Sequence, residues 1–182
     1  MQFNVNRDKP LENQKHHDTA MKYQFQKLAT PIGTIYLVAS GKSLHAIIFA
    51  KNWSEAKKNF DELELLETPV LKATKKQLSD YFIGRRKTFT IPYEIHGTDF
   101  QKRTWRSLTE IPFGKTWSYK QQAIVVKSPK AVRAIGRTNG LNPLPIIIPC
   151  HRVIGSNGKL TGYAGGLKIK EHLLNIEGTG LN

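Results

Sequence analysis

The sequence predicts an α+β protein with a strand-rich first part and a mainly helical second part. Short runs rich in β-branched residues, separated by turn residues, occupy residues 23–50. After residue 98, apolar residues recur mostly at helical spacing. The 182 residues are 39% hydrophobic and 23% charged, which is typical of a globular chain of one domain or two small ones.

The first folded unit is expected over residues 22–93. The preceding residues 1–21 are polar and lack periodicity, which predicts a flexible tail. Residues 23–40 and 43–50 are predicted to form strands, because the turn sequences TPIG and SGKS interrupt their apolar runs.

Two helices and a further strand are expected to complete this unit. A helix is predicted over residues 54–66, with Ser54 as its N-cap. Residues 69–84 space their apolar side chains at near-helical intervals and end in a glycine, which predicts a second helix. Residues 87–95 look like another strand.

The second unit, residues 98–182, is expected to be built mainly from helices. Residues 118–126 and 128–140 predict two short helices joined by a tight turn, a helix-turn-helix candidate. In the second helix of this pair, Ser128 suits the N-cap and Pro129 suits the first helical position.

Two more helices are expected near the ends of this unit. The first covers residues 98–111 and is capped by Thr98 or Asp99. The second covers residues 167–178 and would bury four apolar side chains: Leu167, Ile169, Leu173 and Ile176.

The distribution of charge favours a polyanionic partner. The net charge is +14, and residues 111–170 hold ten Lys and Arg residues but no Asp or Glu. Average composition would put roughly seven acids in such a stretch. A solvated surface usually mixes both signs, so a surface facing nucleic acid is the better interpretation.

The compartment can be predicted from what the chain lacks. It has no apolar run long enough to span a bilayer, and its opening residues lack a signal-peptide core. A single cysteine cannot form an internal disulfide, so we expect a reducing, cytoplasmic location.

The second helix of the candidate pair has a composition suited to DNA. Val132 and Ile135 can face the core, while Arg133 and Arg137, four residues apart, share another face. Three positions carry little or no side chain and would allow close approach to a groove: Ala131, Ala134 and Gly136. The alternative is a helix–helix contact with solvated arginines.

The only cysteine, Cys150, lies in the run IIIPCHRVI, where Pro149 ends an apolar segment. It could be an inert core thiol, a hydrolase nucleophile or the acceptor in a group transfer. His151 and Arg152 are the nearest groups that could promote its ionisation. Glu177, at a helix C-terminus where negative charge is unfavourable, is the candidate partner that orients His151; an exposed acid without a role is the alternative.

Four segments together resemble the O6-alkylguanine-DNA alkyltransferases, also called methylated-DNA–protein-cysteine methyltransferases. They are FQKRTWRSLTEIPFGKTWSY, KAVRAIGRTN, NPLPIIIPCHRVIG and GYAGGLKIKEHLLNIEG. The match is nearly continuous over residues 98–178, and PCHRV is highly specific. The resemblance implies a small ribonuclease-H-like N-terminal domain and a winged-helix-like domain carrying a helix-turn-helix.

The resemblance also implies roles for individual residues. Cys150 would accept the alkyl group from guanine O6, and His151 would remove the thiol proton through a water. Glu177 would hold and polarise His151, and Asn142 would brace the active-site turn against the recognition helix. Tyr119 would crowd the target phosphate and donate to the departing guanine.

The remaining implied roles concern DNA and the flipped base. Arg133 would fill the gap left by the extruded base, and Tyr163 would pack against that base, in a pocket that Pro145 and Ala164 also line. Ala164 replaces a serine of some members and so removes one hydroxyl. Phosphate contacts are expected from Lys120, Lys127 and Lys130.

The predicted function is therefore direct-reversal DNA repair by a protein that alkylates itself once. The expected partner is double-stranded DNA carrying alkylated guanine, bound by a monomer, with O4-alkylthymine left open as a substrate. No cofactor is expected. No metal is expected either, because the structural zinc of some relatives uses two cysteines that this chain lacks, and His16 and His17 alone are too few ligands. A cysteine hydrolase, a DNA-binding regulator and a damage sensor are the alternatives.

Overall fold

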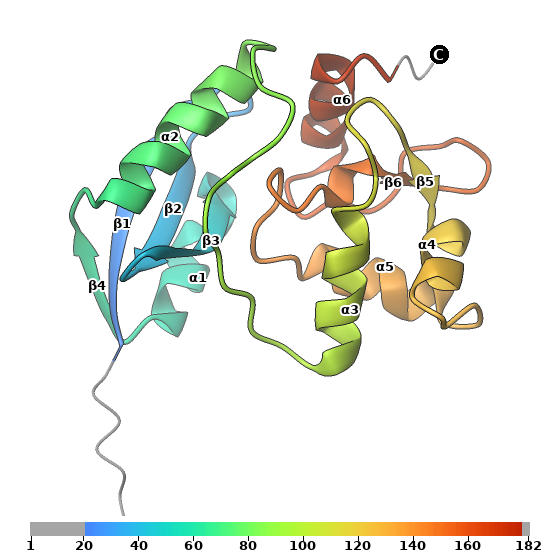
Figure 1. Ribbon diagram of the computed structural model, residues 1–182, viewed down its shortest axis with the longest axis horizontal. Coiled ribbons are helices and arrows are strands. Elements are labelled where there is room, and N and C mark those ends of the chain that lie inside the picture. The colour runs from blue at the N-terminus through green and yellow to red at the C-terminus, as the bar shows by residue number, and fades with distance from the viewer. Residues whose placement is uncertain (1–20, 180–182) are drawn as a thin grey trace, which may run out of the picture.

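The computed structural model describes residues 21–179 and shows a four-stranded sheet followed by a group of helices (Figure 1). The strands are β1 (Lys22–Leu28), β2 (Ile35–Ser40), β3 (Ser43–Phe49) and β4 (Glu62–Leu65), in the spatial order β3-β2-β1-β4. Neighbours in the β1–β2–β3 meander are antiparallel, whereas β4 pairs with β1 in parallel. The predicted strands of residues 23–50 are confirmed.

Helix α2 (Pro69–Phe82) lies across this sheet (Figure 1) and contacts β1, β2 and β3. Its first turn is fixed by Thr68, whose hydroxyl accepts a hydrogen bond from the backbone of Leu71, and by Pro69 at the first helical position. Three side chains of this helix are fully buried in the hydrophobic core: Leu71, Leu78 and Tyr81. The predicted helix over residues 69–84 is therefore present, ending just before Gly84.

Two predictions for the first unit were wrong. Within residues 54–66, helical structure is limited to the short helix α1 (Trp53–Ala56) and the 3-10 helix Lys57–Asn59, because Glu62–Leu65 pairs with β1 as strand β4. Tertiary pairing overrides the helix propensity of its Glu and Leu residues. Ser54 is not a cap, since α1 begins at Trp53.

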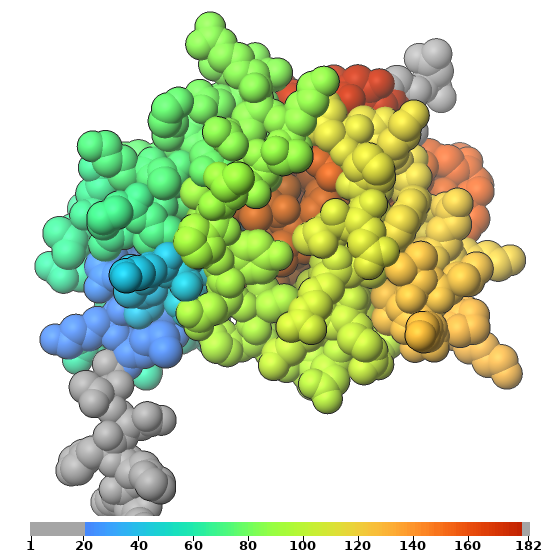
Figure 2. All heavy atoms as spheres, viewed as in Figure 1, coloured from blue at the N-terminus to red at the C-terminus, as the bar shows by residue number. Residues whose placement is uncertain are grey.

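The predicted strand over residues 87–95 is also absent. This segment runs beside β3 and makes one isolated bridge, Leu44 to Tyr93, because Pro92 has no backbone N–H to continue a ladder. It leads from α2 to the helical part, and a hollow opens between it and the residues that follow α3 (Figure 2). Ile147, Pro149 and Arg152 line that hollow.

The second part is mainly helical, with a small two-stranded sheet. Its elements are α3 (Asp99–Leu108), β5 (Trp117–Ser118), α4 (Tyr119–Val125), α5 (Val132–Gly140), the 3-10 helix η3 (Cys150–Arg152), β6 (Val153–Ile154) and α6 (Leu167–Ile176). Strands β5 and β6 are parallel. The molecule is therefore α+β, with a sheet part followed by a helical part, as predicted.

Helices α4 and α5 pack as the expected pair, but α5 begins later than predicted. Its N-cap is Ala131, not Ser128, because Lys127 adopts a left-handed φ of 57° that closes α4. The N–H of Ser128 then donates to the carbonyl of Ala123 at 2.8 Å, and Pro129 lies in the turn.

The prediction that Leu167 of α6 is buried was wrong, because this side chain is 47% exposed.

Side-chain hydrogen bonds tie α3, α4 and α5 together. Trp105 of α3 donates its indole N–H to the carbonyl of Thr138 in α5 at 2.8 Å. Gln122 of α4 donates to the carbonyl of Thr104 and accepts from the amide of Asn139 at 2.7 Å. These buried polar groups are satisfied, so the pair is held in a fixed orientation.

Among residues 21–179, no helix has the length and apolar character needed to cross a membrane.

Candidate active site

Cys150 lies at the start of η3, after a loop that Asn142 holds in shape. The Asn142 amide donates to the carbonyl of Ile148 at 2.7 Å, and its oxygen accepts from Leu144 N at 3.0 Å. Ile146 has a φ of 78°, a strained value for a β-branched residue. The apolar run before Cys150 is thus a braced loop and not a strand.

The thiol of Cys150 is buried, with the residue only 5% exposed. Burial raises the pKa of the Cys150 thiol to about 11, although a hydrogen bond with Asn142 and the positive charge of Lys170 act in the opposite direction. At neutral pH the thiol therefore keeps its proton in the DNA-free protein. A reaction at this sulfur needs a group that takes the proton.

His151, the next residue in the chain, is the candidate for that group. Its Nε2 lies 2.8 Å from Oε1 of Glu177, and both side chains are fully buried. Because burial lowers the pKa of His151, the ring is neutral near pH 7. A carboxylate can only accept, so Nε2 carries the hydrogen and Nδ1 presents a lone pair. Nδ1 is buried and has no hydrogen-bond partner among the described residues.

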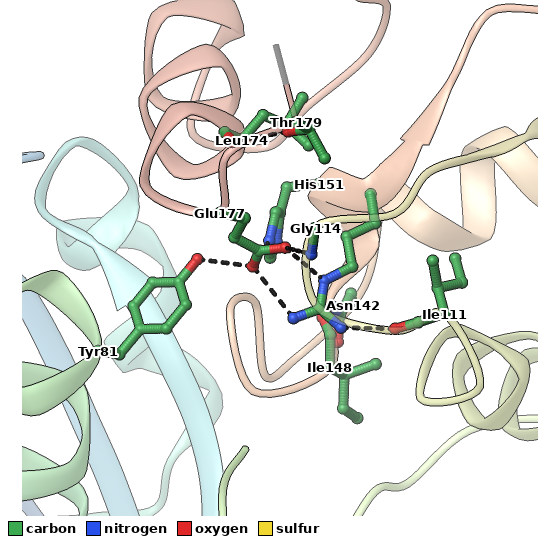
Figure 3. Close-up of polar contacts among 10 residues, drawn as sticks. Tyr81, Ile111, Gly114, Asn142, Ile148, His151, Leu174, Glu177 and Thr179 are labelled. Carbon is green, nitrogen blue, oxygen red and sulfur yellow. Dashed lines mark hydrogen bonds and ion pairs between the residues drawn. The ribbon is translucent and has the colours of Figure 1, made fainter. Parts of the chain in front are cut away.

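Glu177 is the centre of the network shown in Figure 3. Its Oε1 accepts from His151, from the hydroxyl of Tyr81 at 2.9 Å and from Arg152 Nη2 at 3.0 Å. Its Oε2 accepts from Arg152 Nε at 2.8 Å and from Gly114 N at 3.2 Å. Burial alone would raise the pKa of Glu177, but the hydrogen bonds from His151 and Arg152 hold it at about 2.

Gly114 makes this approach possible. Its φ is 74°, and a Cβ there would lie 2.9 Å from the backbone oxygen of Glu177. Any larger residue at position 114 would clash with this oxygen and would move the backbone N–H of residue 114 away from the Glu177 carboxylate. Glu177 and His151 are in contact, and five hydrogen-bond donors offset the unfavourable position of the Glu177 carboxylate after α6.

Lys170 of α6 holds a second part of the site together. Its fully buried ammonium donates to the carbonyls of Val153 and Thr161, at 2.7 Å for Thr161, and more weakly to Gly162 at 3.5 Å. The hydroxyl of Tyr119 donates to Thr161 at 3.2 Å and to Gly162 at 3.4 Å. Both side chains thus fasten the loop that leads to Tyr163.

The residues expected to line the base pocket lie around this loop. Tyr163 is partly buried, its ring meets Phe49 of β3 edge-on at 5.8 Å between centroids, and its hydroxyl is buried without a partner among the described residues. Ala164 and Pro145 line a cavity between β3 and the Asn142 loop. Residues of β3 form one wall of this cavity, whereas neither Tyr163 nor Cys150 lines it.

The residues expected to face DNA lie on α4, α5 and the turn between them. Arg133, Ala134 and the lysines Lys120, Lys127 and Lys130 are exposed, while Ala131 and Gly136 are half-buried. Gly136 lies against the ring of Tyr119, where a Cβ would make ordinary contact at 3.6 Å. These residues all lie within residues 120–136, directly after Tyr119, whose hydroxyl fastens the neighbouring loop.

The contacts of four residues around the candidate site were not predicted. Tyr81 and Gly114 lie 96 and 63 residues from Glu177 in sequence, and no local pattern connects them. Arg152 was expected to influence the thiol, but its guanidinium pairs with Glu177 instead. Lys170 belongs to an ordinary helical pattern, yet it is buried; a lysine on the apolar side of α6, next to Leu173, was the available signal.

This arrangement joins a buried thiol, in the next residue, to a buried imidazole that has one nitrogen free to accept a proton. Two family models match the chain: "6-O-methylguanine DNA methyltransferase, ribonuclease-like domain" over residues 10–95 and "6-O-methylguanine DNA methyltransferase, DNA binding domain" over residues 99–179.

Curated relatives and solved structures agree with these models. The constitutive methylated-DNA–protein-cysteine methyltransferase of Bacillus subtilis is 45% identical over 150 residues, which is 81% of this chain and 91% of the relative. The Methanosarcina mazei protein of that name is 46% identical, covering 82% and 94%. The crystal structure of Mycobacterium tuberculosis O6-methylguanine methyltransferase superposes with a TM-score of 0.77 at 37% identity, covering 85% and 92%. A structure of Mycobacterium tuberculosis OGT in complex with DNA gives a TM-score of 0.76 at 37% identity, covering 88% and 94%. The chain therefore belongs to the family of methylated-DNA–protein-cysteine methyltransferases.

Proposed function

We propose that this protein repairs DNA by direct reversal, moving a methyl or other alkyl group from O6 of a guanine in duplex DNA to its own Cys150. The observation that carries the assignment to Cys150 is the buried His151–Glu177 pair beside the only thiol of the chain. A pair that leaves an imidazole nitrogen free to accept a proton suits a thiol that must be ionised for reaction.

The proton moves first. The Cys150 thiol gives its proton to Nδ1 of His151 through a bridging water, and the carboxylate of Glu177 stabilises the imidazolium that forms. Since the pKa of Glu177 is about 2, the carboxylate stays ionised and does not take the proton itself. The thiolate is thereby made when the substrate is in place, which protects the buried sulfur from other reactions at rest.

The alkyl transfer is a displacement at carbon. The sulfur lone pair forms the S–C bond as the bond between that carbon and guanine O6 breaks, and the electron pair leaves with the guanine. Tyr119, whose hydroxyl now donates to Thr161 and Gly162, is the proposed donor to the departing base. The product is a thioether that no nearby group can hydrolyse, so each molecule reacts once.

The target base must leave the duplex to reach a buried thiol. Extrusion costs a few kcal/mol. Arg133 on the exposed face of α5 is proposed to occupy the gap, and the small residues Ala131, Ala134 and Gly136 allow α5 to approach the groove. Lys120, Lys127 and Lys130 would supply phosphate contacts that depend on salt but not on sequence.

The pocket for the extruded base is proposed to lie between Tyr163, Pro145 and Ala164. The unpartnered Tyr163 hydroxyl is available for a polar contact there. A cytoplasmic location is proposed on chemical grounds, since the acceptor must stay a reduced thiol.

The test separates transfer from binding. Wild type and Cys150→Ser are each mixed with a duplex that carries one radiolabelled O6-methylguanine, and DNA affinity is measured in parallel by fluorescence anisotropy. We expect label on wild type only, with similar affinities for both proteins. Label on Cys150→Ser would remove Cys150 as acceptor, and label on neither protein with retained binding would favour a damage sensor or regulator.

A further inference from the structure

We propose that the hollow beside the loop before Cys150 is a binding site for a small phosphate monoester. The hollow opens between the segment that joins the two parts of the molecule and the residues that follow α3 (Figure 2). Its volume is about 290 Å³, near the lower end of the ~300–1,000 Å³ that small-molecule sites occupy. The site lies outside the residues to which alkyl transfer is assigned, so it does not rest on the function proposed above.

Two cationic side chains meet at this hollow from different parts of the chain. Lys87 comes from the joining segment and Arg152 from η3, and both line the hollow. The Nζ of Lys87 lies 5.6 Å from the centroid of the Phe113 ring, and Cζ of Arg152 lies 5.8 Å from the same centroid. Two positive groups around one ring repel each other, and an anion between them would remove that repulsion.

The protein itself supplies no counter-charge to Lys87. Among the described residues that line the hollow, none is acidic. Lys87 forms no ion pair with any residue between 21 and 179. Two acids of neighbouring elements are already engaged, since Glu177 pairs with Arg152 and Asp80 pairs with Lys76. The field at the hollow therefore favours an anionic ligand.

Arg152 retains donors that such a ligand can use. Its Nε and Nη2 each donate to Glu177, and its Nη1 donates to the carbonyl of Ile111. A guanidinium carries five N–H groups, so two of them have no partner in the described part of the chain. Arg152 is 7% exposed and lines the hollow, so a ligand can reach it from that side. Planar guanidinium donors match the oxygens of a phosphate group.

The rest of the lining selects for an organic phosphate over the bare ion. The aromatic rings of Phe89 and Tyr93 line the hollow, and the hydroxyls of Thr88 and Tyr93 make no hydrogen bond to another described residue. An apolar ester group can lie against the rings while the phosphate oxygens accept from Lys87 and Arg152. A monoester dianion brings two negative charges to these two cations, whereas a backbone diester of DNA brings one and carries a sugar on each side.

The experiment uses phenyl phosphate as the probe, with inorganic phosphate and a thymidine tetranucleotide as comparisons. Full-length protein labelled with ¹⁵N is titrated at constant ionic strength, and amide shifts are followed by NMR. We expect saturable shifts at residues 87–89, 109 and 150–152. Phenyl phosphate should bind more tightly than inorganic phosphate, because only it contacts the two aromatic rings. The tetranucleotide should shift residues 119–134 instead.

Two variants test the assignment to the hollow. Lys87→Ala removes one cation and Thr88→Glu adds a negative charge to the lining; both positions are exposed, so both variants should fold. Lys87→Ala should weaken binding of phenyl phosphate roughly tenfold, the loss expected for one charged hydrogen bond. Thr88→Glu should abolish the shifts at residues 87–89 and 150–152.

Two control variants exclude other cationic sites. Lys42→Ala removes an exposed lysine in the turn between β2 and β3, and Lys120→Ala/Lys127→Ala/Lys130→Ala removes the cations expected to face DNA. Both should bind phenyl phosphate like wild type. Absence of saturable shifts, shifts confined to residues 119–134, or equal affinity of Lys87→Ala and wild type would each overturn the proposal. So would shifts at the hollow with the tetranucleotide but not with phenyl phosphate, which would assign it to a DNA backbone.

Discussion

The hydroxyl of Tyr81 donates a hydrogen bond of 2.9 Å to Oε1 of Glu177, the oxygen that also faces His151. Tyr81 belongs to α2 in the sheet part, whereas Glu177 follows the last helix. Burial raises the pKa of Tyr81 far above its usual value, so its phenol remains a donor at all working pH values. The sheet part therefore fixes the carboxylate that orients the proposed base.

Removing this bond should slow alkyl transfer without weakening DNA binding. A hydrogen bond to a charged group contributes about 1.5–3 kcal/mol, and if half of it acts on His151, Tyr81→Phe should react about threefold to tenfold more slowly. Single-turnover rates at saturating duplex measure this. The matched control is Tyr36→Phe, whose ring stacks on Trp53 outside the network. Equal rates for Tyr81→Phe and wild type would show that Glu177 is oriented without the sheet part.

Glu177 should make the protein sensitive to acid. Its pKa is about 2 in the folded protein against 4.5 for the free side chain, so the folded state binds fewer protons in that interval. The free energy of unfolding should therefore fall as pH drops from about 5 to 2, by about 3 kcal/mol from this group. Urea unfolding of wild type and Glu177→Gln at several pH values measures the difference, since the variant lacks this titration. Parallel pH dependences would contradict the assigned pKa.

Arg133 and Arg137 should separate base extrusion from general DNA affinity. Both are exposed and lie one turn apart on α5. Arg133→Ala should slow repair of duplex DNA at least tenfold while reaction with free O6-benzylguanine stays near wild type, because only the duplex needs extrusion. Arg137→Ala should weaken duplex binding with a smaller effect on rate at saturation. If Arg133→Ala slows both substrates equally, Arg133 does not occupy the gap.

Lys170 should control the order of the loop before Tyr163. Lys170→Met keeps the length of the side chain but leaves the carbonyls of Val153 and Thr161 without this donor, at a cost of about 1–3 kcal/mol. Hydrogen exchange of residues 155–163 should become faster in this variant. Lys168→Met, an exposed change on the same helix, should leave exchange unaltered. Unchanged protection in Lys170→Met would mean that Tyr119 alone fastens the loop.

Local patterns predicted the parts of the fold that local forces decide. The strands before residue 50 and the cap at Thr98 follow from residues close in sequence. Residues 54–66 were misassigned because strand β4 depends on pairing with β1, which no window of that segment contains. The start of α5 was missed because Lys127, a non-glycine residue, adopts the left-handed conformation.

The residues of the candidate site also fall into those that local sequence could predict and those that it could not. Cys150, His151 and Glu177 could be chosen because a lone thiol beside a histidine, and an acid at a helix C-terminus, are unusual in themselves. Tyr81 and Gly114 reach Glu177 only through the packing of distant elements.

The most direct test of the account is the intact mass of the protein after reaction with a duplex that carries one O6-methylguanine. The account predicts a gain of one methyl group per chain, located on Cys150 by peptide mapping, which stops at one equivalent however much substrate is added. No gain in mass with the duplex still bound, or a methyl group on any other residue, would contradict the assignment of Cys150 as the alkyl acceptor.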